Sequence, residues 1–575
     1  MMRLTRSHRL LLCGSIAAVL YLSGLGRPAL WEPDEGRYAE VAREMVVRGD
    51  YVTPHNDWVP YLEKPPLVYW ATAASLRLFG PNESAVRLQA ALFSIGQVVV
   101  TAALGEVMFG AAAGLLGALA LALSPLFFAF ARFATPDPAL AFCMTSALAA
   151  FFMASRAPHI GKGAGRLWMI AAAGMLALGT LAKGPVALVL GGSIALAWLI
   201  FQRRGHDALK IPWLSCGLVY VAIAVPWFVI AARRNPGFLE FFFIHEHFQR
   251  YLANTEHSWG PWFFFPVVIG GIWPWFFFVP LGILAMRGND KASAPPGSLS
   301  FLLIWFGLIF VFFSIPRSKL GEYILPALPP LAIVTGFGIA CLDAMQPARV
   351  RRLLGWLLGL NGVLALAVTI LAISALRQGA MTSALVADAL SAAFALFVAT
   401  TAGYLIARQQ PDRRIVAIAP LAMGVLLFMG AGMKAREDGA SMFSYRSLAR
   451  AIAPVTANGC ILASYRHQIQ SLPFYTGARE RLVGYQGELA PFGQSGDAKQ
   501  TFIATNTQLN VLWSSSACLV LVANRNDIGH LADLLKPPPS IIGCEGKKFA
   551  LLNRVGQRSP RLPIECRLEV APLPP

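Results

Sequence analysis

Apolar runs of about 20 residues, separated by short polar segments, recur along the chain between residues 8 and 434. A helix of that length crosses the roughly 30 Å hydrocarbon core of a bilayer. The pattern therefore predicts a polytopic α-helical membrane protein with about 13 transmembrane helices. The predicted spans cover residues 10–30, 84–105, 111–131, 138–154, 167–183, 185–201, 211–232, 260–285, 299–315, 322–342, 353–376, 381–407 and 415–433.

The composition agrees with this pattern and changes the meaning of the net charge. Hydrophobic residues make up 56% of the 575 positions and charged residues 14%, which excludes an ordinary soluble globular protein. The net charge of +18 would suggest nucleic acid binding in a soluble protein. However, the loops on the N-terminal side of the predicted spans hold 17 Lys and Arg against 5 Asp and Glu. This bias places the N-terminus in the cytoplasm and explains most of the charge without a nucleic acid partner.

The tail after the last span has a different character. Its mixed polarity predicts two domains, a membrane domain over residues 1–434 and a soluble domain over residues 435–575. Segments such as Cys460–Ser464 and Ala517–Val522 are typical of buried strands, so we expect a small mixed α/β domain. The odd number of spans places this domain outside the cytoplasm.

The cysteines and the first span lead to two further expectations. An oxidising compartment would permit disulfides in the tail, where four cysteines allow three connectivities. The first apolar span follows Arg3, Arg6 and Arg9 and lacks a small-residue cleavage site, so we expect a retained helix. The cysteines lie in or beside spans (Cys13, Cys143, Cys216, Cys341) or in the tail (Cys460, Cys518, Cys544, Cys566).

The longest external loop before the tail, residues 31–83, concentrates carboxylates. Residues 35–48 place apolar side chains on one face and charged ones on the others, which predicts an interfacial helix. Asp34 stands at the start of this helix. It is either a functional carboxylate or a helix N-cap.

Two further external motifs carry the same ambiguity. Glu63 and Lys64 precede two prolines that stiffen the backbone, so this turn can hold the lysine toward an anion, or the two residues can form a surface ion pair. Asp137 lies between two prolines at the start of a predicted span, where an N-cap is the ordinary role.

The topology places these groups on one membrane face together with several cations. Lys183 lies in a tight turn between two spans, Lys319 and Tyr323 lie in another turn, and Arg250 follows the aromatic run that begins at Phe238. Ionisable groups at a membrane boundary usually have a function. Cations around a few carboxylates suit a phosphate-bearing lipid head group, and we expect Lys64, Arg250 and Lys319 to bind its phosphate.

The sequence disfavours a nucleotide donor and leaves a metal open. It contains neither a phosphate-binding loop of the Walker type nor a dinucleotide glycine fingerprint. His245 and His247 lack the i, i+4 spacing of a helical zinc pair. A divalent metal would therefore need a ligand from elsewhere, such as Glu63.

Seven motifs resemble those of one family, in the same order along the chain. The chain resembles the bacterial lipid A aminoarabinose transferases, which belong to the wider protein O-mannosyltransferase-like superfamily. The resemblance covers roughly residues 28–335. The motifs are Trp31–Glu40 (WEPDEGRYAE), Tyr61–Pro66 (YLEKPP), Gly80–Arg87 (GPNESAVR), Pro136–Pro138 (PDP), Thr180–Gly184 (TLAKG), His245–Arg250 (HEHFQR) and Ser318–Pro326 (SKLGEYILP).

The resemblance implies a membrane glycosyltransferase of the GT-C type in a bacterial inner membrane, with its active site and the C-terminal domain in the periplasm. Such an enzyme moves a sugar, such as 4-amino-4-deoxy-L-arabinose, from a polyprenyl-phosphate donor to lipid A or another extracytoplasmic acceptor. Asp34 and Asp137 match the catalytic positions, and Glu63 and His245 are the metal candidates. The implied substrate-binding residues are Arg37, Tyr38, Tyr61, Glu63, Lys64, Lys183, Arg250, Lys319 and Tyr323.

Pro66 and Leu67 depart from the aminoarabinose pattern, so the identity of the sugar stays open. Three alternative functions also remain. A protein O-glycosyltransferase would use the same donor type. A transporter of lipid-linked sugars would place its ionisable groups along a path near the bilayer midplane, often within repeats. An assembly protein would have no use for the external cluster of Lys, Arg and Asp.

Overall fold

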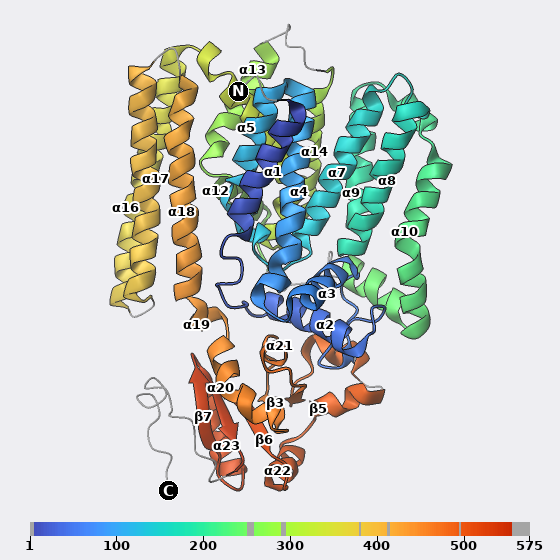
Figure 1. Cartoon of the computed structure of the whole chain (residues 1–575), viewed down its shortest axis with the longest axis vertical. Helices are drawn as coiled ribbons and strands as arrows, with labels where there is room; N and C mark the ends of the chain where they lie inside the picture. Colours follow the sequence, from blue (N-terminus) through green and yellow to red (C-terminus); the bar gives the residue numbers. More distant parts are fainter. Residues whose placement is uncertain are drawn as a thin grey trace. The chain divides into compact units, whose positions relative to one another are not determined.

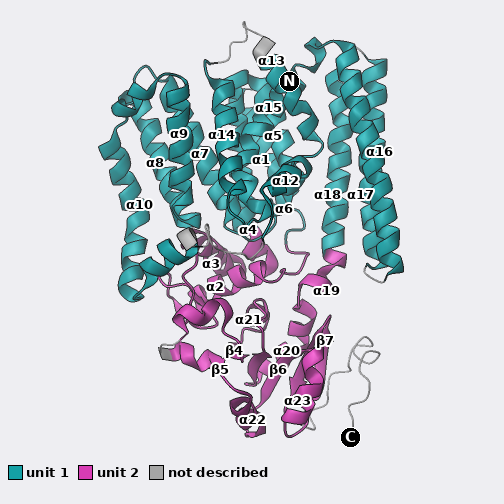
Figure 2. Cartoon of the chain, turned by 180° about the vertical axis from the view of Figure 1, so that it is seen from behind, with its two compact units in different colours: residues 1–25, 88–436 teal, residues 26–87, 437–575 magenta. Residues whose placement is uncertain are grey.

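The computed structural model describes residues 5–249, 258–288, 295–378, 381–410, 414–493 and 496–554. Contacts divide the chain into two compact units (Figure 2). Unit 1 comprises residues 1–25 and 88–436, and unit 2 comprises residues 26–87 and 437–575. The loop that the sequence assigns to the membrane domain therefore packs with the tail.

Unit 1 is built from helices, and every predicted span coincides with helical segments of it (Figure 1). The neighbouring pairs α7 and α8, α5 and α15, and α16 and α17 pack against one another. The α-helices are α1 (Arg6–Leu22), α4 (Glu83–Phe109), α5 (Ala111–Ala122), α6 (Pro125–Ala131), α7 (Asp137–Arg156), α8 (Gly163–Lys183), α9 (Val186–Phe201), α10 (Trp213–Arg234), α12 (Phe264–Gly271), α13 (Val279–Gly288), α14 (Ser298–Ser314), α15 (Leu328–Ala340), α16 (Pro347–Arg377), α17 (Ser383–Gln409) and α18 (Ile418–Asp438).

Two predicted spans are broken in the structure. Within the described residues, eight helices are individually long and apolar enough to cross a membrane, or ten when two bent pairs count as one span each. The helices α5 and α6 meet at 66° before Pro125, and Pro261–Gly271 and Trp275–Met286 meet at 93° around Pro274. Proline lacks the backbone amide that would continue the helical hydrogen bonds. The prediction of a single continuous helix was therefore wrong for these two spans. The total of 13 stays a prediction.

The first span is also shorter than predicted. Helix α1 ends at Leu22, with Ser23 as its C-cap, instead of reaching residue 30. Gly24 follows with a φ of 64°, a backbone conformation that glycine adopts without the steric cost that other residues incur. Gly24, Gly26 and Pro28 interrupt an apolar run that hydropathy alone extends.

Unit 2 contains a six-stranded mixed sheet in the order β5-β4-β3-β6-β8-β7. The strands β5, β4, β3 and β6 run parallel, while β8 pairs antiparallel with β6 and β7. The two predicted strand segments lie in β3 and β6, which are confirmed as central strands. The strands of this sheet are β3 (Ile461–Tyr465), β4 (Glu480–Val483), β5 (Phe502–Ile503), β6 (Leu519–Asn524), β7 (Ser540–Glu545) and β8 (Lys548–Leu552).

Apolar side chains fill both faces of this sheet. Trp513 and Phe549 lie in one buried cluster, and Leu448 and Val522 lie in the other. The tail helices are α19 (Ala440–Phe443), α20 (Arg446–Ala457), α21 (Leu472–Thr476), α22 (Asn506–Ser514) and α23 (Ile528–Leu534). The loop contributes α2 (Asp34–Arg48), α3 (Leu67–Phe79) and the short strands β1 (His55–Asn56) and β2 (Val59–Pro60).

Helix α2 occupies the residues predicted to be helical, but it is not the amphipathic surface helix that was expected. Ten of its 15 residues are buried, including Glu35, Glu40 and Glu44. A Cβ atom on Gly36 would lie 2.6 Å from the backbone nitrogen of Ser471, so the helix approaches the tail backbone at van der Waals distance. The charged face is buried because ion pairs and backbone amides satisfy its carboxylates.

Hydrogen bonds between buried carboxylates and the tail hold the loop in unit 2. The Glu32 carboxylate accepts hydrogen bonds from the backbone amides of Gln470 (2.9 Å) and Ser471 (2.8 Å). The Asp57 carboxylate accepts bonds from the Gln468 side chain (2.6 Å) and the Glu480 amide (3.2 Å). Because loop and tail pack together, they lie on the same side of any membrane that unit 1 crosses.

Two of the tail cysteines form a disulfide that lies wholly within the described residues. Cys460 and Cys518 form a disulfide between the residues that precede β3 and β6. This selects one of the three predicted connectivities. Cys566 lies outside the described residues.

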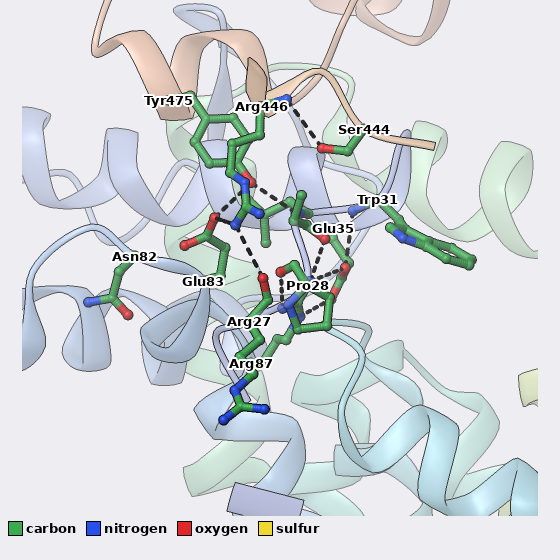
Figure 3. Close-up of polar contacts among 12 residues, drawn as sticks. Arg27, Pro28, Trp31, Glu35, Asn82, Glu83, Arg87, Ser444, Arg446 and Tyr475 are labelled. Atoms are coloured by element: carbon green, nitrogen blue, oxygen red, sulfur yellow. Dashed lines mark hydrogen bonds and ion pairs between the residues drawn. The ribbon is translucent and has the colours of Figure 1, made fainter. Parts of the chain in front are cut away.

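Arg87 of the GPNESAVR motif anchors the chain that precedes α2 (Figure 3). Its guanidinium is fully buried and binds both oxygens of Glu35 at 2.7 Å. It also donates to the backbone carbonyls of Pro28 (2.7 Å) and Ala29 (2.8 Å). This planar set of donors fixes the position of the α2 start, and with it the position of Asp34.

Replacing Arg87 with lysine should lower the free energy of unfolding of the purified chain by about 1 to 2 kcal/mol. A lysine keeps the charge but lacks the fork that binds a carboxylate and two carbonyls together. Arg77→Lys, on the exposed side of α3, is the matched control and should stay within about 0.5 kcal/mol of wild type. Equal thermal unfolding of both variants would contradict the anchoring role.

The buried carboxylates that join loop and tail should make unit 2 less stable as the pH rises. Burial raises the pKa of Glu32 to about 7. The hydrogen bonds from Ser471 and Gln470 and the charge of Arg37 lower this pKa, but they offset only part of the effect of burial. Burial and the charge of Glu40 raise the pKa of Asp57 to about 7. A carboxylate with a raised pKa in the folded state contributes stability below its unfolded pKa and loses it as the pH passes its folded value.

We therefore expect each of these two groups to cost about 1 kcal/mol of stability between pH 6 and pH 8. Thermal unfolding of the detergent-purified chain across this interval measures the sum. Glu32→Gln removes one titrating group and should flatten the curve by that group's share. A free energy of unfolding that rises from pH 6 to pH 8 in the wild type would contradict this prediction.

Candidate functional site

The predicted catalytic carboxylate of unit 2 lies at the first residue of α2 and does not cap the helix. The N-cap is Pro33, and no side-chain capping bond is formed there. Instead, Asp34 Oδ1 accepts a bond of 2.8 Å from Arg37 Nη2, one turn further along the helix. The Asp34 side chain is 40% exposed, so one face of the carboxylate is open to a substrate. The capping alternative is therefore wrong for this residue.

Arg37 is the centre of the polar network around Asp34. Its Nη1 lies 2.6 Å from Glu488 Oε2 and 3.1 Å from Tyr61 Oη, and Tyr61 donates to the same Glu488 oxygen at 3.3 Å. Burial lowers the pKa of Arg37, but Tyr61, Glu488 and Asp34 more than offset this, so its pKa is raised. The guanidinium therefore stays charged and orients both carboxylates.

Glu63 and Lys64 follow β2 in the turn before α3. Lys64 Nζ lies 3.8 Å from Glu63 Oε2 and donates to the Glu63 backbone carbonyl at 3.3 Å. The Glu63 side chain is buried, whereas 21% of the Lys64 side chain is exposed. Glu63 thus contacts the Lys64 ammonium through its backbone carbonyl and carboxylate, and the partly exposed Lys64 side chain can also contact a ligand.

Buried polar atoms in the same region are available for a ligand or for water. Within the part of the chain that the structure describes, Arg37 Nε and Tyr69 Oη are buried and have no hydrogen-bond partner. Tyr38, a predicted binding residue, packs against Tyr69 with ring centroids 5.7 Å apart. Buried donors usually have partners, so atoms of this kind are expected beside a substrate.

The second predicted carboxylate, Asp137, belongs to unit 1. It is the first residue of α7, and again the N-cap is a proline without a side-chain bond. Its Oδ1 accepts a bond from Lys183 Nζ at the end of α8. The same ammonium lies 4.3 Å from the centre of the Tyr323 ring. Three residues predicted to bind or react thus come together, and the capping alternative for Asp137 is wrong.

The remaining predicted phosphate ligands are placed differently. Lys319 is almost completely buried, and its ammonium donates to the backbone carbonyls of Pro316 and Trp259. It holds the turn at Arg317 against the segment at Ser258, where the two backbones form a bridge. Arg250 lies outside the described residues. A phosphate-binding role for either residue stays a prediction.

The described residues contain no group of three His, Cys, Asp or Glu side chains that could hold a metal ion. His245 lies with its Nδ1 3.4 Å from Glu246 Oε1, and its ring stacks on Phe241. The two candidates Glu63 and His245 belong to different units.

Sequence reasoning missed Glu488 and Tyr69. Glu488 lies in the short 3₁₀ helix Gly487–Phe492 of the tail, 451 positions from Arg37. No local pattern marks this carboxylate. Tyr69 lies three residues beyond Pro66 in the apolar start of α3, where its ring is typical of a core.

Comparisons with known proteins agree on one type of fold. Residues 8–242 match the family described as dolichyl-phosphate-mannose-protein mannosyltransferase. The crystal structure of ArnT from Cupriavidus metallidurans bound to undecaprenyl phosphate superposes with a TM-score of 0.83 at 29% identity, covering 95% of this chain and 98% of that one. The expected GT-C type of fold is thereby confirmed.

Curated relatives include undecaprenyl phosphate-α-4-amino-4-deoxy-L-arabinose arabinosyl transferases of several bacteria. The protein of Serratia proteamaculans is 34% identical over 358 residues, which cover 61% of this chain and 63% of the relative. That of Enterobacter sp. is 30% identical over 416 residues, which cover 71% of this chain and 74% of the relative. The chain thus matches just under two thirds of the first relative's length and about three quarters of the second's.

Proposed function

Because the chain belongs to the family of undecaprenyl phosphate-α-4-amino-4-deoxy-L-arabinose arabinosyl transferases, we propose that it is a membrane glycosyltransferase that moves this aminopentose from a polyprenyl phosphate to lipid A. The main support is the likeness over 95% of the chain to a relative bound to undecaprenyl phosphate. The polar network at the start of α2 supplies the chemistry that such a transfer needs.

The donor requires cations at its phosphate. A polyprenyl phosphate leaves with the electron pair of the bond to the anomeric carbon, so its negative charge grows during the reaction. Lys64, with a partly exposed side chain, supplies a cation for that charge. Arg37 stays charged in its carboxylate network and keeps that network fixed as the phosphate leaves.

The acceptor determines what Asp34 does. If a lipid A phosphate attacks, its oxygen is already anionic, a new bond forms between this oxygen and the anomeric carbon, and the bond to the polyprenyl phosphate breaks. Positive charge develops on the sugar in such a displacement. The open face of the Asp34 carboxylate, fixed by Arg37, then stabilises that charge.

One observation favours a second acceptor class. The family model that matches residues 8–242 is described by a protein mannosyltransferase activity. With a serine or threonine hydroxyl as acceptor, Asp34 would accept the proton that the hydroxyl loses. The same site residues thus serve either acceptor.

Transfer by the purified full-length chain separates these two acceptors. The chain is incubated with the polyprenyl-phosphate aminopentose and either lipid A, lipid A freed of its phosphates, or a Ser- and Thr-containing peptide. We expect the sugar only on phosphorylated lipid A, with release of polyprenyl phosphate. Sugar on the peptide and none on lipid A would favour the protein acceptor, and transfer to neither would refute the proposal.

A further inference from the structure

Unit 2 contains a pocket of about 510 Å³ that the proposed reaction does not use. It opens between the later turns of α2, the segment that joins α3 to α4, and the tail helices α20 and α21. Its polar lining comes mainly from Arg43, Arg446, Arg450, Glu83 and Tyr475. Pockets of this size hold small-molecule ligands or head groups.

The pocket lies apart from the Asp34 network. Arg43 is nine residues after Asp34 on the same helix, which corresponds to about 13 Å along the axis. Arg37 and Glu488, which surround Asp34, do not line it. A ligand here is therefore not the reacting sugar.

Arginines give this pocket a positive character. Arg446 Nη1 binds Glu83 Oε1 at 2.9 Å, and Tyr475 donates to the same oxygen at 3.1 Å (Figure 3). Arg43 uses Nε and Nη2 to bind Glu40. Arg450 is exposed and forms no hydrogen bond or ion pair with any residue that the structure describes.

The guanidiniums therefore outnumber the carboxylates, even with Glu40 included. Arg450, Arg43 Nη1 and Arg446 Nη2 form no hydrogen bond within the described residues and can bind an incoming ligand. Guanidinium groups match the oxygens of a phosphate in pairs. The pocket thus favours an anion, and a phosphate group in particular.

Apolar surface borders the same pocket. Val46, Val47, Leu76 and Phe474 contribute to its lining, and Val47 is 60% exposed. The end of α3 adds the exposed side chains of Leu78 (76%) and Phe79 (62%) nearby in sequence. Large exposed apolar side chains beside cations are typical of a protein surface that meets lipid.

We propose that this pocket binds the head group of an anionic membrane lipid with a terminal phosphate. The arginines bind the phosphate, and the apolar border contacts the acyl chains. A soluble phosphate would use the arginines alone, so the apolar border is what favours a lipid. This inference does not depend on the proposed sugar transfer, because the pocket lies apart from the Asp34 network.

Native mass spectrometry of the full chain in detergent tests the proposal with defined probes. Phosphatidic acid carries the terminal phosphate, diacylglycerol lacks it, and glycerol 3-phosphate lacks the acyl chains. We expect saturable binding of phosphatidic acid only. Arg450→Gln should weaken it about 10-fold, since one charge-assisted contact is lost. Arg525→Gln, an exposed arginine elsewhere in unit 2, is the matched control and should bind like wild type.

The outcomes separate this pocket from the donor site. Arg450 has no partner to lose among the described residues, so its replacement leaves the fold intact, and Arg446→Gln is a second variant with the same expected direction. Lys64→Ala should bind phosphatidic acid normally. Equal binding by wild type, Arg450→Gln and Arg446→Gln would refute the proposal. Glycerol 3-phosphate binding as tightly as the lipid would also refute it, in favour of a soluble anion.

Discussion

Asp34→Asn should lower the rate of sugar transfer at least 100-fold while the protein stays folded. The carboxylate accepts a hydrogen bond from Arg37 and caps no helix, so asparagine keeps an acceptor oxygen for Arg37 and loses only the charge. Removing one preorganised electrostatic contact to a transition state typically costs about 100- to 1000-fold in rate. Transfer of labelled sugar under saturating donor measures this effect.

The matched control is Asp50→Asn in the same loop. Asp50 Oδ1 accepts bonds from the backbone amides of Val52 and Thr53, a role that asparagine fills as well as aspartate. The control should transfer sugar at nearly the wild-type rate, and Asp34→Asn should still bind polyprenyl phosphate. Near-normal transfer by Asp34→Asn would show that this carboxylate takes no part in the reaction.

Lys64→Ala should weaken the binding of polyprenyl phosphate about 10- to 100-fold. Loss of a charge-assisted contact in a partly buried site costs about 1.5 to 3 kcal/mol. An uncharged polyprenol should bind wild type and variant alike, because it has no phosphate for the ammonium to contact. Titration of both lipids isolates the phosphate's share of the binding.

Lys547→Ala, an exposed lysine of the tail, controls for the general loss of one positive charge. It should bind the phosphorylated lipid like wild type. If Lys64→Ala does so too, Glu63 and Lys64 form only a surface ion pair, and the phosphate is bound by other residues.

The positions of the helices followed from hydropathy, but their continuity did not. Apolar length predicts a segment that can cross a bilayer, and each predicted span coincides with helical structure. The breaks at Pro125 and Pro274 depend on how freed backbone groups are satisfied by neighbouring segments, which hydropathy does not encode. Hydropathy also does not encode the early end of α1, which is followed by Gly24 in the left-handed backbone conformation.

The candidate site was predicted where the motif residues are local and missed where they are distant. Asp34, Arg37, Glu63 and Lys64 come from two motifs within one loop, and the structure places them in one unit. Glu488 comes from the tail and meets Arg37 only through folding. Periodicity cannot predict such a contact.

Helix α2 illustrates how a tertiary partner can reverse a local prediction. Its charged face is typical of a helix exposed to water at a membrane surface. Arg87 neutralises Glu35, and Arg43 neutralises Glu40, so the same face is buried. The capping role first considered for Asp34 failed for a related reason, because Arg37 competes for the carboxylate.

Mass spectrometry of lipid A tests the central claim most directly. A bacterial host without such a transferase of its own would express either the wild-type chain or Asp34→Asn at equal levels. The account predicts lipid A heavier by one aminopentose per modified phosphate with the wild type, and unmodified lipid A with the variant. Identical lipid A from both strains, or the sugar found on proteins instead, would contradict it.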